Sequence, residues 1–487
     1  MPLPDAAPTF RNPILPGDRP DPAMVRVGED FYLTYSSFDT VPGLAIWHSR
    51  NLVDWTPIAD ALPNPPGTVF APDLVHHDGR FFLYIPCIPA PWSALTEPEI
   101  FVITADDPAG PWSEPVSTGV RGAIDPGHGV DEEGRRWLFV NGIRRAPLDA
   151  DGLRTTAPLE HVYDGWRYPD EWITEAYALE GPKLFRREDW YYLVSAVGGT
   201  AGPPTGHMVI VARSRSLHGP WENSPHNPVT RTQDASEAWW SRGHATILDA
   251  PDGTWWMVSH GYEKDYRTLG RQMLLEPIEW TDDAWPIAPA RDLGAALPRP
   301  LPHIPAAPAL PAPRWHVEDG GPQATARVRT EGDRILLRAT GTSPADSAPL
   351  ATLSLSHRYR VEVTVDPAEG TTGALLLYFD SRLFCGMAWD GEHMISYAGG
   401  IATHWREPVT HRGPLRLRLE NIDHIVTGWY AAPGGDWQRH GVRYDASGYH
   451  AATMQDLKSL RPALAAFGTG EVAFTDLVYD PSIEEDR

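Results

Sequence analysis

The chain has 487 residues, with 64 acidic against 41 basic side chains and a formal net charge of −23. This charge excludes nucleic acid and anionic membrane surfaces as favoured partners and fits a neutral or cationic ligand. At about 100–200 residues per domain, the length predicts two or three units, or a repeat array with an added module.

The cysteine content and the N-terminal sequence bear on the compartment. Cys87 and Cys385 are the only cysteines, so a disulfide framework is excluded and two buried thiols are expected. The first residues show neither a basic region nor an apolar run of signal length, and no run of about 20 apolar residues follows. We therefore expect a cytoplasmic protein without a membrane partner.

Five similar segments follow one another in the first 260 residues. Each is a short apolar strand, a turn rich in Asp, Glu or Gly, and an aromatic-rich strand, which is typical of a β-hairpin. The segments are MVRVGEDFYLTYS from Met24, LVHHDGRFFLYIP from Leu74, GVDEEGRRWLFVN from Gly129, LFRREDWYYLVSA from Leu184 and ILDAPDGTWWMVS from Ile247.

The spacing of these segments predicts the fold of the first part of the chain. The first aromatic residue after the turn recurs about every 50–65 residues, at Phe31, Phe81, Trp137, Trp190 and Trp255. Repeats of this length that contain several short strands are typical of β-propeller blades. Since no sustained helical period occurs before about residue 300, a βα-barrel is excluded. We predict an all-β protein whose residues 1–292 form a five-bladed β-propeller.

The composition changes after the last repeat. Residues 293–314 contain the Pro/Ala stretch PRPLPHIPAAPALPAPRW, which lacks backbone donors at its prolines and predicts a semi-rigid linker. Beyond it, alternating apolar runs such as YRVEVTV and LRLRLE, separated by Gly, Asp and Pro, predict a β-sandwich over residues 315–487.

Acidic residues recur at one point of the repeat. In a propeller, the innermost strand of every blade begins near the axis, so residues at equivalent points of successive repeats converge. Four of the five equivalent positions, 10 to 12 residues before the marker aromatic, carry Asp, Glu or His. The five positions are Asp21, Ala71, Asp125, Glu180 and His244.

Three acids at one end of a channel predict acid–base chemistry. Their mutual repulsion separates their pKa values, so that at least one is protonated near neutral pH. Hydrolysis of a glycosidic bond needs one such acid and one carboxylate, and the 20 Trp and 17 Tyr suit stacking on sugar faces. The alternative is that Asp-Pro and Glu-Gly-Pro only form turns at the strand starts, but three acids in phase with a five-fold repeat favour a site.

Metal and phosphate chemistry find little support in the sequence. His244 fits a metal ligand, a substrate contact or a buried orienting group, and a lone histidine is usually the last of these. No HExxH or paired Cys/His spacing occurs, so we expect no catalytic metal and no required cofactor. If a calcium ion binds near His244 at the axis, we expect it to be an accessory. Glycine-rich phosphate loops are absent.

These motifs resemble glycoside hydrolase family 43, which includes β-xylosidases and α-L-arabinofuranosidases. The resemblance rests on NPILPGDRPDPAMVRVGEDFYLTYS, AIDPGHGVDEEGRRWLFV, LEGPKLFRREDWYYLVSAVGGT, RGHATILDAPDGTWWMVSHG and LGRQMLLEPIEW. The C-terminal part resembles the concanavalin-like β-sandwich of the β-xylosidase branch.

Matched position by position, the resemblance implies roles for individual residues. Asp21 is the general base, Glu180 the general acid, and Asp125 the carboxylate that tunes and holds Glu180, in an inverting mechanism. The substrate contacts it implies are Arg271, His244 and the aromatic residues Phe38 and Phe70. We also expect exo action, because a pocket at the mouth of a narrow five-bladed channel and a cytoplasmic location both suit short oligosaccharides. The predicted function is that of a β-1,4-xylosidase acting on xylo-oligosaccharides.

Two departures leave the sugar open. Phe70 stands where many members carry Trp, and SSFDTVPG lacks a second aromatic found in relatives near Thr40 or Val41. An α-L-arabinofuranosidase or other furanosidase therefore stays an alternative, and the oligomeric state is also open. From another class, a carbohydrate-binding propeller without catalysis predicts the loss of one acid, whereas Asp21, Asp125 and Glu180 are all present.

Overall fold

The computed structural model describes residues 8–305, 314–404 and 409–483. The chain divides into two compact units, both built of β-strands. The first unit contains residues 1–38, 43–265 and 271–311, and the second contains residues 39–42, 266–270 and 312–487.

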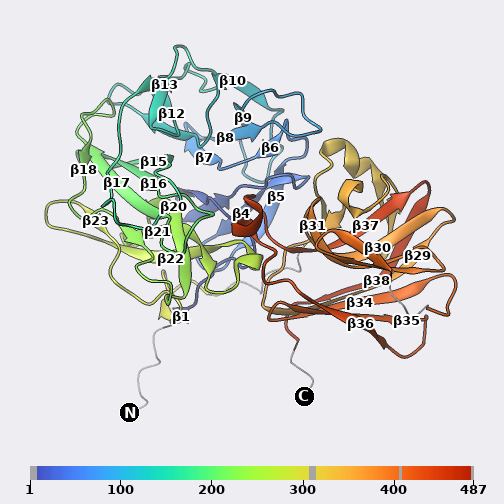
Figure 1. The fold of residues 1–487 in the computed structure, drawn as a ribbon. Coiled ribbons are helices and arrows are strands. Elements are labelled where there is room, and N and C mark those ends of the chain that lie inside the picture. The colour runs from blue at the N-terminus through green and yellow to red at the C-terminus, as the bar shows by residue number, and fades with distance from the viewer. Residues whose placement is uncertain (1–7, 306–313, 405–408, 484–487) are drawn as a thin grey trace. The chain divides into compact units, whose positions relative to one another are not determined.

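The first unit is the predicted five-bladed propeller (Figure 1). Each blade is an antiparallel sheet of four or five strands. The blades are β2 (Ala23–Val27), β3 (Asp30–Thr34), β4 (Gly43–Ser49) and β5 (Thr56–Leu62); β6 (Thr68–Val69), β7 (Asp73–His77), β8 (Arg80–Ile88), β9 (Glu99–Ala105) and β10 (Val116–Arg121); β11 (Gly127–Val130), β12 (Arg136–Val140), β13 (Arg144–Pro147) and β14 (Glu160–His161); β15 (Glu180–Arg187), β16 (Trp190–Val197), β17 (Met208–Ser214), β18 (Glu222–Asn223) and β19 (Thr230–Arg231); and β20 (Trp239–Asp249), β21 (Trp255–Glu263), β22 (Arg271–Trp280) and β23 (Pro286–Ile287).

Hydrophobic clusters join each blade to the next around the ring. Leu44 of the first blade packs in one cluster with Phe81 of the second, and Leu33 of the first packs in another with Val258 of the fifth. Three further clusters join the second blade to the third, the third to the fourth and the fourth to the fifth. The core of this unit is therefore a closed series of layers between blades, which fixes the position of each inner strand.

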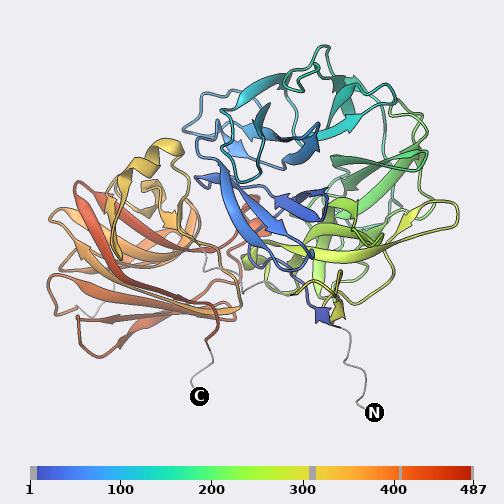
Figure 2. The ribbon, with the colours of Figure 1, turned by 180° about the vertical axis from the view of Figure 1, so that it is seen from behind.

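A strand pair follows the fifth blade and differs from the linker that the sequence predicted. β24 (Leu297–Pro298) pairs antiparallel with β1 (Thr9–Phe10), and Figure 2 shows the two strands side by side. Leu297 and Leu301 are buried in the same cluster as residues of the first and fifth blades. The apolar side chains between the prolines explain the difference, because burying them outweighs the lost backbone donors. Residues 306–313 of the predicted linker lie outside the described residues.

The second unit contains two seven-stranded antiparallel sheets. One holds β25 (His316–Val317), β28 (Leu350–Ala351), β30 (Thr371–Asp380), β31 (Leu383–Trp389), β32 (Met394–Ala398), β33 (Ile401–His404) and β37 (Arg461–Gly468); the other holds β26 (Val328–Glu331), β27 (Arg334–Arg338), β29 (Arg358–Pro367), β34 (Leu415–Ile422), β35 (Ile425–Ala431), β36 (Gln438–Asp445) and β38 (Glu471–Asp480). One core cluster contains Leu375 and Leu464 of the first sheet with Val363 and Leu417 of the second. This is the predicted β-sandwich.

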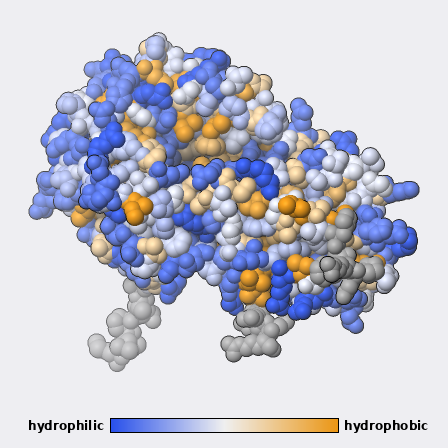
Figure 3. Space-filling model, in the orientation of Figure 1, coloured by the Kyte–Doolittle hydropathy of each residue, from blue (hydrophilic) through white to orange (hydrophobic). Residues whose placement is uncertain are grey.

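Helices are short in the described residues. They are η1 (Arg267–Leu269), η2 (Pro322–Arg327), η3 (Pro344–Asp346) and α1 (Ala451–Met454). None of the helices in the described part of the chain has the length and apolar character needed to cross a membrane. On the face seen in Figure 3 the surface is mostly hydrophilic, and its hydrophobic residues form small separate groups.

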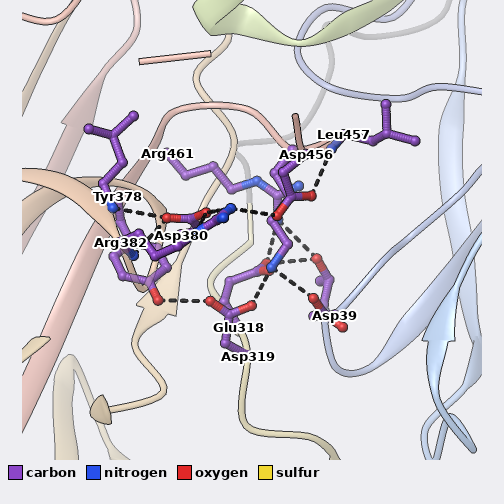
Figure 4. Close-up of polar contacts among 12 residues, drawn as sticks. Asp39, Glu318, Asp319, Tyr378, Asp380, Arg382, Asp456, Leu457 and Arg461 are labelled. Atoms are coloured by element: carbon purple, nitrogen blue, oxygen red, sulfur yellow. Dashed lines mark hydrogen bonds and ion pairs between the residues drawn. The ribbon is translucent and has the colours of Figure 1, made fainter. Parts of the chain in front are cut away.

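The second unit also holds residues 39–42, the segment that directly follows Phe38 in the sequence. Val41 and Val317 exchange backbone hydrogen bonds of 3.0 and 3.2 Å. The Lys458 ammonium lies 2.7 Å from Asp39 Oδ2 and also contacts Asp319. Figure 4 labels these two carboxylates among the neighbouring polar contacts. These contacts make the short segment a structural part of the sandwich.

Candidate active site

The predicted acids stand at the starts of inner strands. Asp21 lies two residues before β2, Asp125 lies two residues before β11, and Glu180 is the first residue of β15. His244 lies within β20, the inner strand of the fifth blade. The repeat therefore places all four at equivalent points of four blades, as the sequence predicted.

The backbone is unusual at three of these four positions. Asp21, Asp125 and His244 have φ values of 59°, 55° and 49°, in the left-handed region that side chains other than glycine seldom adopt. In the fourth blade, Gly181, next to Glu180, takes this conformation, with φ of 61°. Backbone strain of this kind persists where the surrounding structure holds it and gathers at functional sites.

Asp21 is held as a carboxylate. Its Oδ1 accepts a hydrogen bond of 2.9 Å from Arg271 Nη1, and its Oδ2 accepts one of 2.6 Å from Ser36 Oγ. Burial alone would raise the pKa of Asp21, but the attraction of the Arg271 guanidinium is the largest opposing effect, and the pKa lies well below its ordinary range. Asp21 is therefore ionised across the neutral range.

Glu180 has the opposite electrostatic character. Burial, followed by repulsion from Asp21, raises the pKa of its carboxyl to about 8, against the opposing attraction of Arg271. Glu180 is therefore protonated at neutral pH, and the negative charge of the ionised Asp21 favours this state. Two carboxyl groups with pKa values on opposite sides of neutrality are the arrangement that acid and base catalysis requires.

Asp125 lies beside the start of β15. Its Oδ2 accepts a hydrogen bond of 3.1 Å from the backbone N–H of Gly181, which follows Glu180. Burial, then repulsion from Glu180 and from Asp21, raises the pKa of Asp125 well above its usual value. The three carboxyl groups thus interact electrostatically, and Asp125 also contacts the backbone that carries Glu180.

Arg271 and two phenylalanines lie together. Arg271 is 2% exposed, and its guanidinium carbon lies 5.7 Å from the centre of the Phe38 ring. The Phe38 and Phe70 rings meet edge to face, with centres 5.5 Å apart. Arg271 Nε and Nη2 are buried and have no hydrogen-bond partner among the described groups. Since buried donors are normally paired, these nitrogens suit oxygen atoms of a bound ligand.

Three histidines also lie in this region. His244 Nδ1 lies 3.5 Å from Asp21 Oδ1, and burial lowers the pKa of His244 well below its ordinary value. His260 on β21 accepts a hydrogen bond of 2.9 Å at Nδ1 from the backbone N–H of Asp21. His207, just before β17, lies with its Nε2 3.4 Å from Glu180 Oε1.

The sequence pattern did not identify His207 and His260. Both lie outside the inner strands, so neither recurs in phase with the acids. Strand pairing in the fifth blade could have identified His260, because His260 pairs with Gly243, the residue before His244. No periodic signal marks His207.

The described residues give no indication of a metal centre. The residues that the structure describes contain no group of three or more His, Cys, Asp or Glu side chains arranged to hold a metal ion. His244 contacts an ion-paired carboxylate and is neutral, which fits the buried orienting role considered for it.

A five-bladed propeller with one ionised and one protonated carboxyl at its inner strand starts has the architecture of a glycoside hydrolase. Residues 10–286, more than half of the chain, match the family model "Glycosyl hydrolases family 43". The chain belongs to this family.

Curated relatives of known name match the same part of the chain. A "Xylan 1,3-beta-xylosidase" from a Vibrio species is 34% identical over 322 residues, which cover 57% of this chain and 57% of that protein. A "Non-reducing end alpha-L-arabinofuranosidase" from Bacteroides ovatus is 34% identical over 312 residues, which cover 57% of this chain and 53% of that protein. The matches span little more than half the length of these relatives.

Solved structures resemble the chain over nearly its whole length. The crystal structure of a xylan beta-1,4-xylosidase from Bacillus halodurans superposes with a TM-score of 0.82 at 24% identity, covering 97% of this chain and all of that one. At this identity the likeness shows the fold, namely a propeller followed by a sandwich.

Proposed function

We propose that the protein is an exo-acting β-1,4-xylosidase that releases terminal xylose from xylo-oligosaccharides with inversion at the anomeric carbon. The observation that carries this proposal is the contrast between Asp21, ionised beside Arg271, and Glu180, protonated at neutral pH. An inverting glycosidase needs one carboxylate to activate water and one carboxylic acid to protonate the leaving oxygen.

The proposed reaction is a single displacement. Asp21 takes a proton from a water molecule, and the water oxygen forms a bond to the anomeric carbon. The bond between that carbon and the glycosidic oxygen breaks, and the oxygen takes the proton of Glu180. The products are one monosaccharide and an oligosaccharide that is one unit shorter.

The groups around the acids fit a neutral sugar. Arg271 offers buried Nε and Nη2 donors without described partners, and Phe38 and Phe70 offer aromatic carbon next to them. Hydroxyl groups and apolar sugar faces are the complements of these two features. The names of the Vibrio and Bacillus relatives support xylose as the sugar.

The second candidate is an α-L-arabinofuranosidase, which the name of the Bacteroides relative favours. Hydrolysis of 4-nitrophenyl β-D-xylopyranoside and 4-nitrophenyl α-L-arabinofuranoside separates the two. We expect the higher kcat/KM on the xyloside. A higher kcat/KM on the arabinofuranoside would transfer the proposal to the second candidate.

A carbohydrate-binding propeller without catalysis is the candidate from another class. The retention of all three buried acids with separated pKa values opposes it. Binding of xylotriose detected by calorimetry, with no xylose detected by chromatography after prolonged incubation, would show that the protein binds the oligosaccharide without hydrolysing it.

Exo action is tested on a xylopentaose labelled at its reducing end. We expect xylose and labelled xylotetraose as the first products. A spread of shorter labelled products at the earliest times would show endo cleavage and contradict this part of the proposal.

We also propose that hydrolysis needs no cofactor, with calcium at most an accessory. Activity after exhaustive treatment with EDTA should equal that of the untreated enzyme. Loss of activity that calcium restores would contradict the proposal. The cytoplasmic location stays a prediction, for which fractionation of the producing cells is the test.

A further inference from the structure

Two buried histidines lie between the residues that supply the base and the acid. His260 and His207 are both 0% exposed, and His260 Nε2 lies 3.3 Å from His207 Nδ1. Burial lowers the pKa of His260 to about 3 and that of His207 to about 4. Both rings are therefore neutral at neutral pH, and each carries its single proton on one nitrogen.

A backbone donor determines which nitrogen of His260 carries the proton. The N–H of Asp21 donates to His260 Nδ1 at 2.9 Å. Asp21 Oδ1 also lies 3.1 Å from Nδ1 and would favour a proton on that nitrogen. We place the lone pair on Nδ1 because a backbone N–H can only donate, and a proton on Nδ1 would leave this buried donor facing a second N–H at 2.9 Å. The ring proton of His260 then lies on Nε2. This Nε2–H faces Thr200 Oγ1 and His207 Nδ1, each 3.3 Å away.

The proton position on His207 follows from that on His260. A proton on His207 Nδ1 would point at the Nε2–H of His260, whereas a lone pair there accepts from it. The neutral His207 ring then carries its proton on Nε2. That nitrogen is buried, has no hydrogen-bond partner within the described part of the chain, and lies 3.4 Å from Glu180 Oε1.

We propose that His207 is a positioning residue that donates its Nε2–H to Glu180 Oε1 and is itself oriented by His260 and the backbone of Asp21. This inference rests on the proposed function, because it assigns Glu180 the role of general acid. The present separation of 3.4 Å shortens as the substrate docks, since catalytic hydrogen bonds are often long before substrate binds.

The donated hydrogen bond has two consequences for the acid. Oε1 acts as the acceptor, so the carboxyl proton of Glu180 stays on Oε2 for transfer to the leaving oxygen. When that proton departs, the N–H stabilises the carboxylate that remains, and it does so more strongly than it stabilised the neutral acid. His207 thus favours the transition state over the ground state.

The packing around His207 keeps its ring in place. A Cβ added to Gly243, on the inner strand of the fifth blade, would lie 2.4 to 2.6 Å from three atoms of the His207 ring. Contacts this short do not occur, so the glycine leaves the space that the ring fills. The ring therefore has no room to turn away from Glu180 on that side.

The first test replaces the donor and keeps the ring. We expect His207→Phe to lower kcat on xylobiose by about 10- to 100-fold, the effect of losing one hydrogen bond to a charged group. On 2,4-dinitrophenyl β-D-xylopyranoside, whose leaving group needs little protonation, the loss should be less than threefold. His207→Gln, which keeps an N–H donor, should recover much of the xylobiose activity.

The pH profile gives a second readout that a structural role would not change. The charged groups facing Glu180 are Asp21, Asp125, Arg271 and Glu175, and His207→Phe alters none of them. Loss of a donor to the carboxylate raises the pKa of Glu180. The alkaline limb of kcat/KM should therefore move to higher pH in His207→Phe.

A matched control is His128→Phe, which removes another buried histidine of the propeller, one that accepts a hydrogen bond of 2.9 Å from Arg136 Nε. Any loss in this variant should be equal on the two substrates. Equal losses on both substrates for His207→Phe, or no loss on either, would overturn the proposal. If the wild type releases sugar from neither substrate, the proposed function fails instead.

The proton positions are tested without any activity measurement. In a nitrogen–proton correlation spectrum of the wild-type protein with ¹⁵N-labelled histidine, His207 and His260 are assigned through the variants that lack them. Both rings should show the neutral form protonated at Nε2. A His207 ring protonated at Nδ1, or at both nitrogens, contradicts the inference even if the enzyme is a xylosidase.

Discussion

At the scale of single residues, the site shows how one fold gives three carboxyl groups different properties. Burial raises the pKa of each, and the difference lies in what else each group contacts. Asp21 pairs with Arg271, whereas Glu180 lies against the negative charge of Asp21. The repeat alone predicts that the pKa values separate, whereas their order came from the resemblance to family 43, because Arg271 lies some 250 residues from Asp21 in the chain and the repeat does not connect them.

The roles of the two acids are tested by their amide variants. Asp21→Asn removes the base and should lower kcat by about 10²–10⁴-fold on every substrate. Glu180→Gln should show a similar loss on xylobiose and a much smaller one on an activated dinitrophenyl xyloside, because that leaving group departs without a proton. Kinetics on both substrates, with circular dichroism to confirm folding, check this. Equal losses in Glu180→Gln on the two substrates would contradict its role as acid.

The pH dependence of kcat/KM follows from the same two groups. Glu180 must be protonated, so activity should fall as the pH rises through about 8. Asp21 must be ionised, and because its pKa lies well below the usual range, activity should persist at pH values below that range until the enzyme unfolds.

Arg271→Met provides the check on that profile. Without the guanidinium, burial raises the pKa of Asp21, so the acid limb should move to higher pH whatever the change in overall rate. An acid limb at the same pH in the variant and the wild type would show that Arg271 does not set the pKa of Asp21.

At the scale of elements, the start of the inner strand is the part of the site that the sequence defines best. An aromatic residue after each turn marks the second strand, so counting back to the inner strand located Asp21, Asp125, Glu180 and His244 without any structure. The same counting does not reach His207, which precedes the third strand of its blade. Side chains that approach the site from outer strands have no shared position in the repeat, and only the folded structure brings them together.

The ion pairs of residues 39–42 allow an element-scale prediction for the second unit. Lys458, with its side chain 11% exposed, forms ion pairs with Asp39 and Asp319. Lys458→Met leaves two carboxylates without their cation, and removal of one partner from a buried pair costs about 3–5 kcal/mol. We expect this loss in the free energy of unfolding of the sandwich. Arg329→Met, in the same unit but with a side chain 58% exposed, is the control and should cost at most about 1 kcal/mol.

The direction in which stability changes with pH distinguishes the wild type from Lys458→Met. In the wild type, burial would raise the pKa of Asp319, but Lys458 lowers it below its ordinary value. Its contribution to stability is therefore present above the unfolded pKa of about 4 and is lost as the pH falls. In Lys458→Met burial dominates, the folded pKa rises, and the variant should gain stability relative to wild type on going from pH 7 to pH 4. Thermal unfolding at the two pH values checks this, and parallel curves would contradict it.

At the scale of the whole molecule, the ring of blades determines from which directions the three carboxyl groups approach the site. The interblade clusters give the order of the blades and place the fifth between the fourth and the first. Asp21 of the first blade and Glu180 of the fourth therefore come from blades that are not neighbours. The number of repeats predicted this ring. The sequence did not predict how the chain continues beyond the fifth blade, where β24 pairs with β1.

This separation leads to a prediction about stereochemistry. Carboxyl groups on blades that are not neighbours leave space between them for a water molecule and a sugar. Inverting glycosidases hold the two groups about 6.5–9.5 Å apart, whereas retaining enzymes hold them about 5–5.5 Å apart and form a covalent intermediate. Asp21 also accepts hydrogen bonds from Arg271 and Ser36, which make it a weak nucleophile but leave it charged to attract a proton from water.

We therefore expect the first xylose released from a β-xyloside to be the α-anomer. Proton NMR of the reaction, recorded within the first minutes and before mutarotation equilibrates the anomers, measures this directly. The α-anomeric signal should appear first and the β signal should grow later at the rate of mutarotation in buffer. Release of β-xylose first, or mass-spectrometric detection of a xylosyl adduct on Asp21 with a fluorinated xyloside, would show that Asp21 attacks the sugar itself.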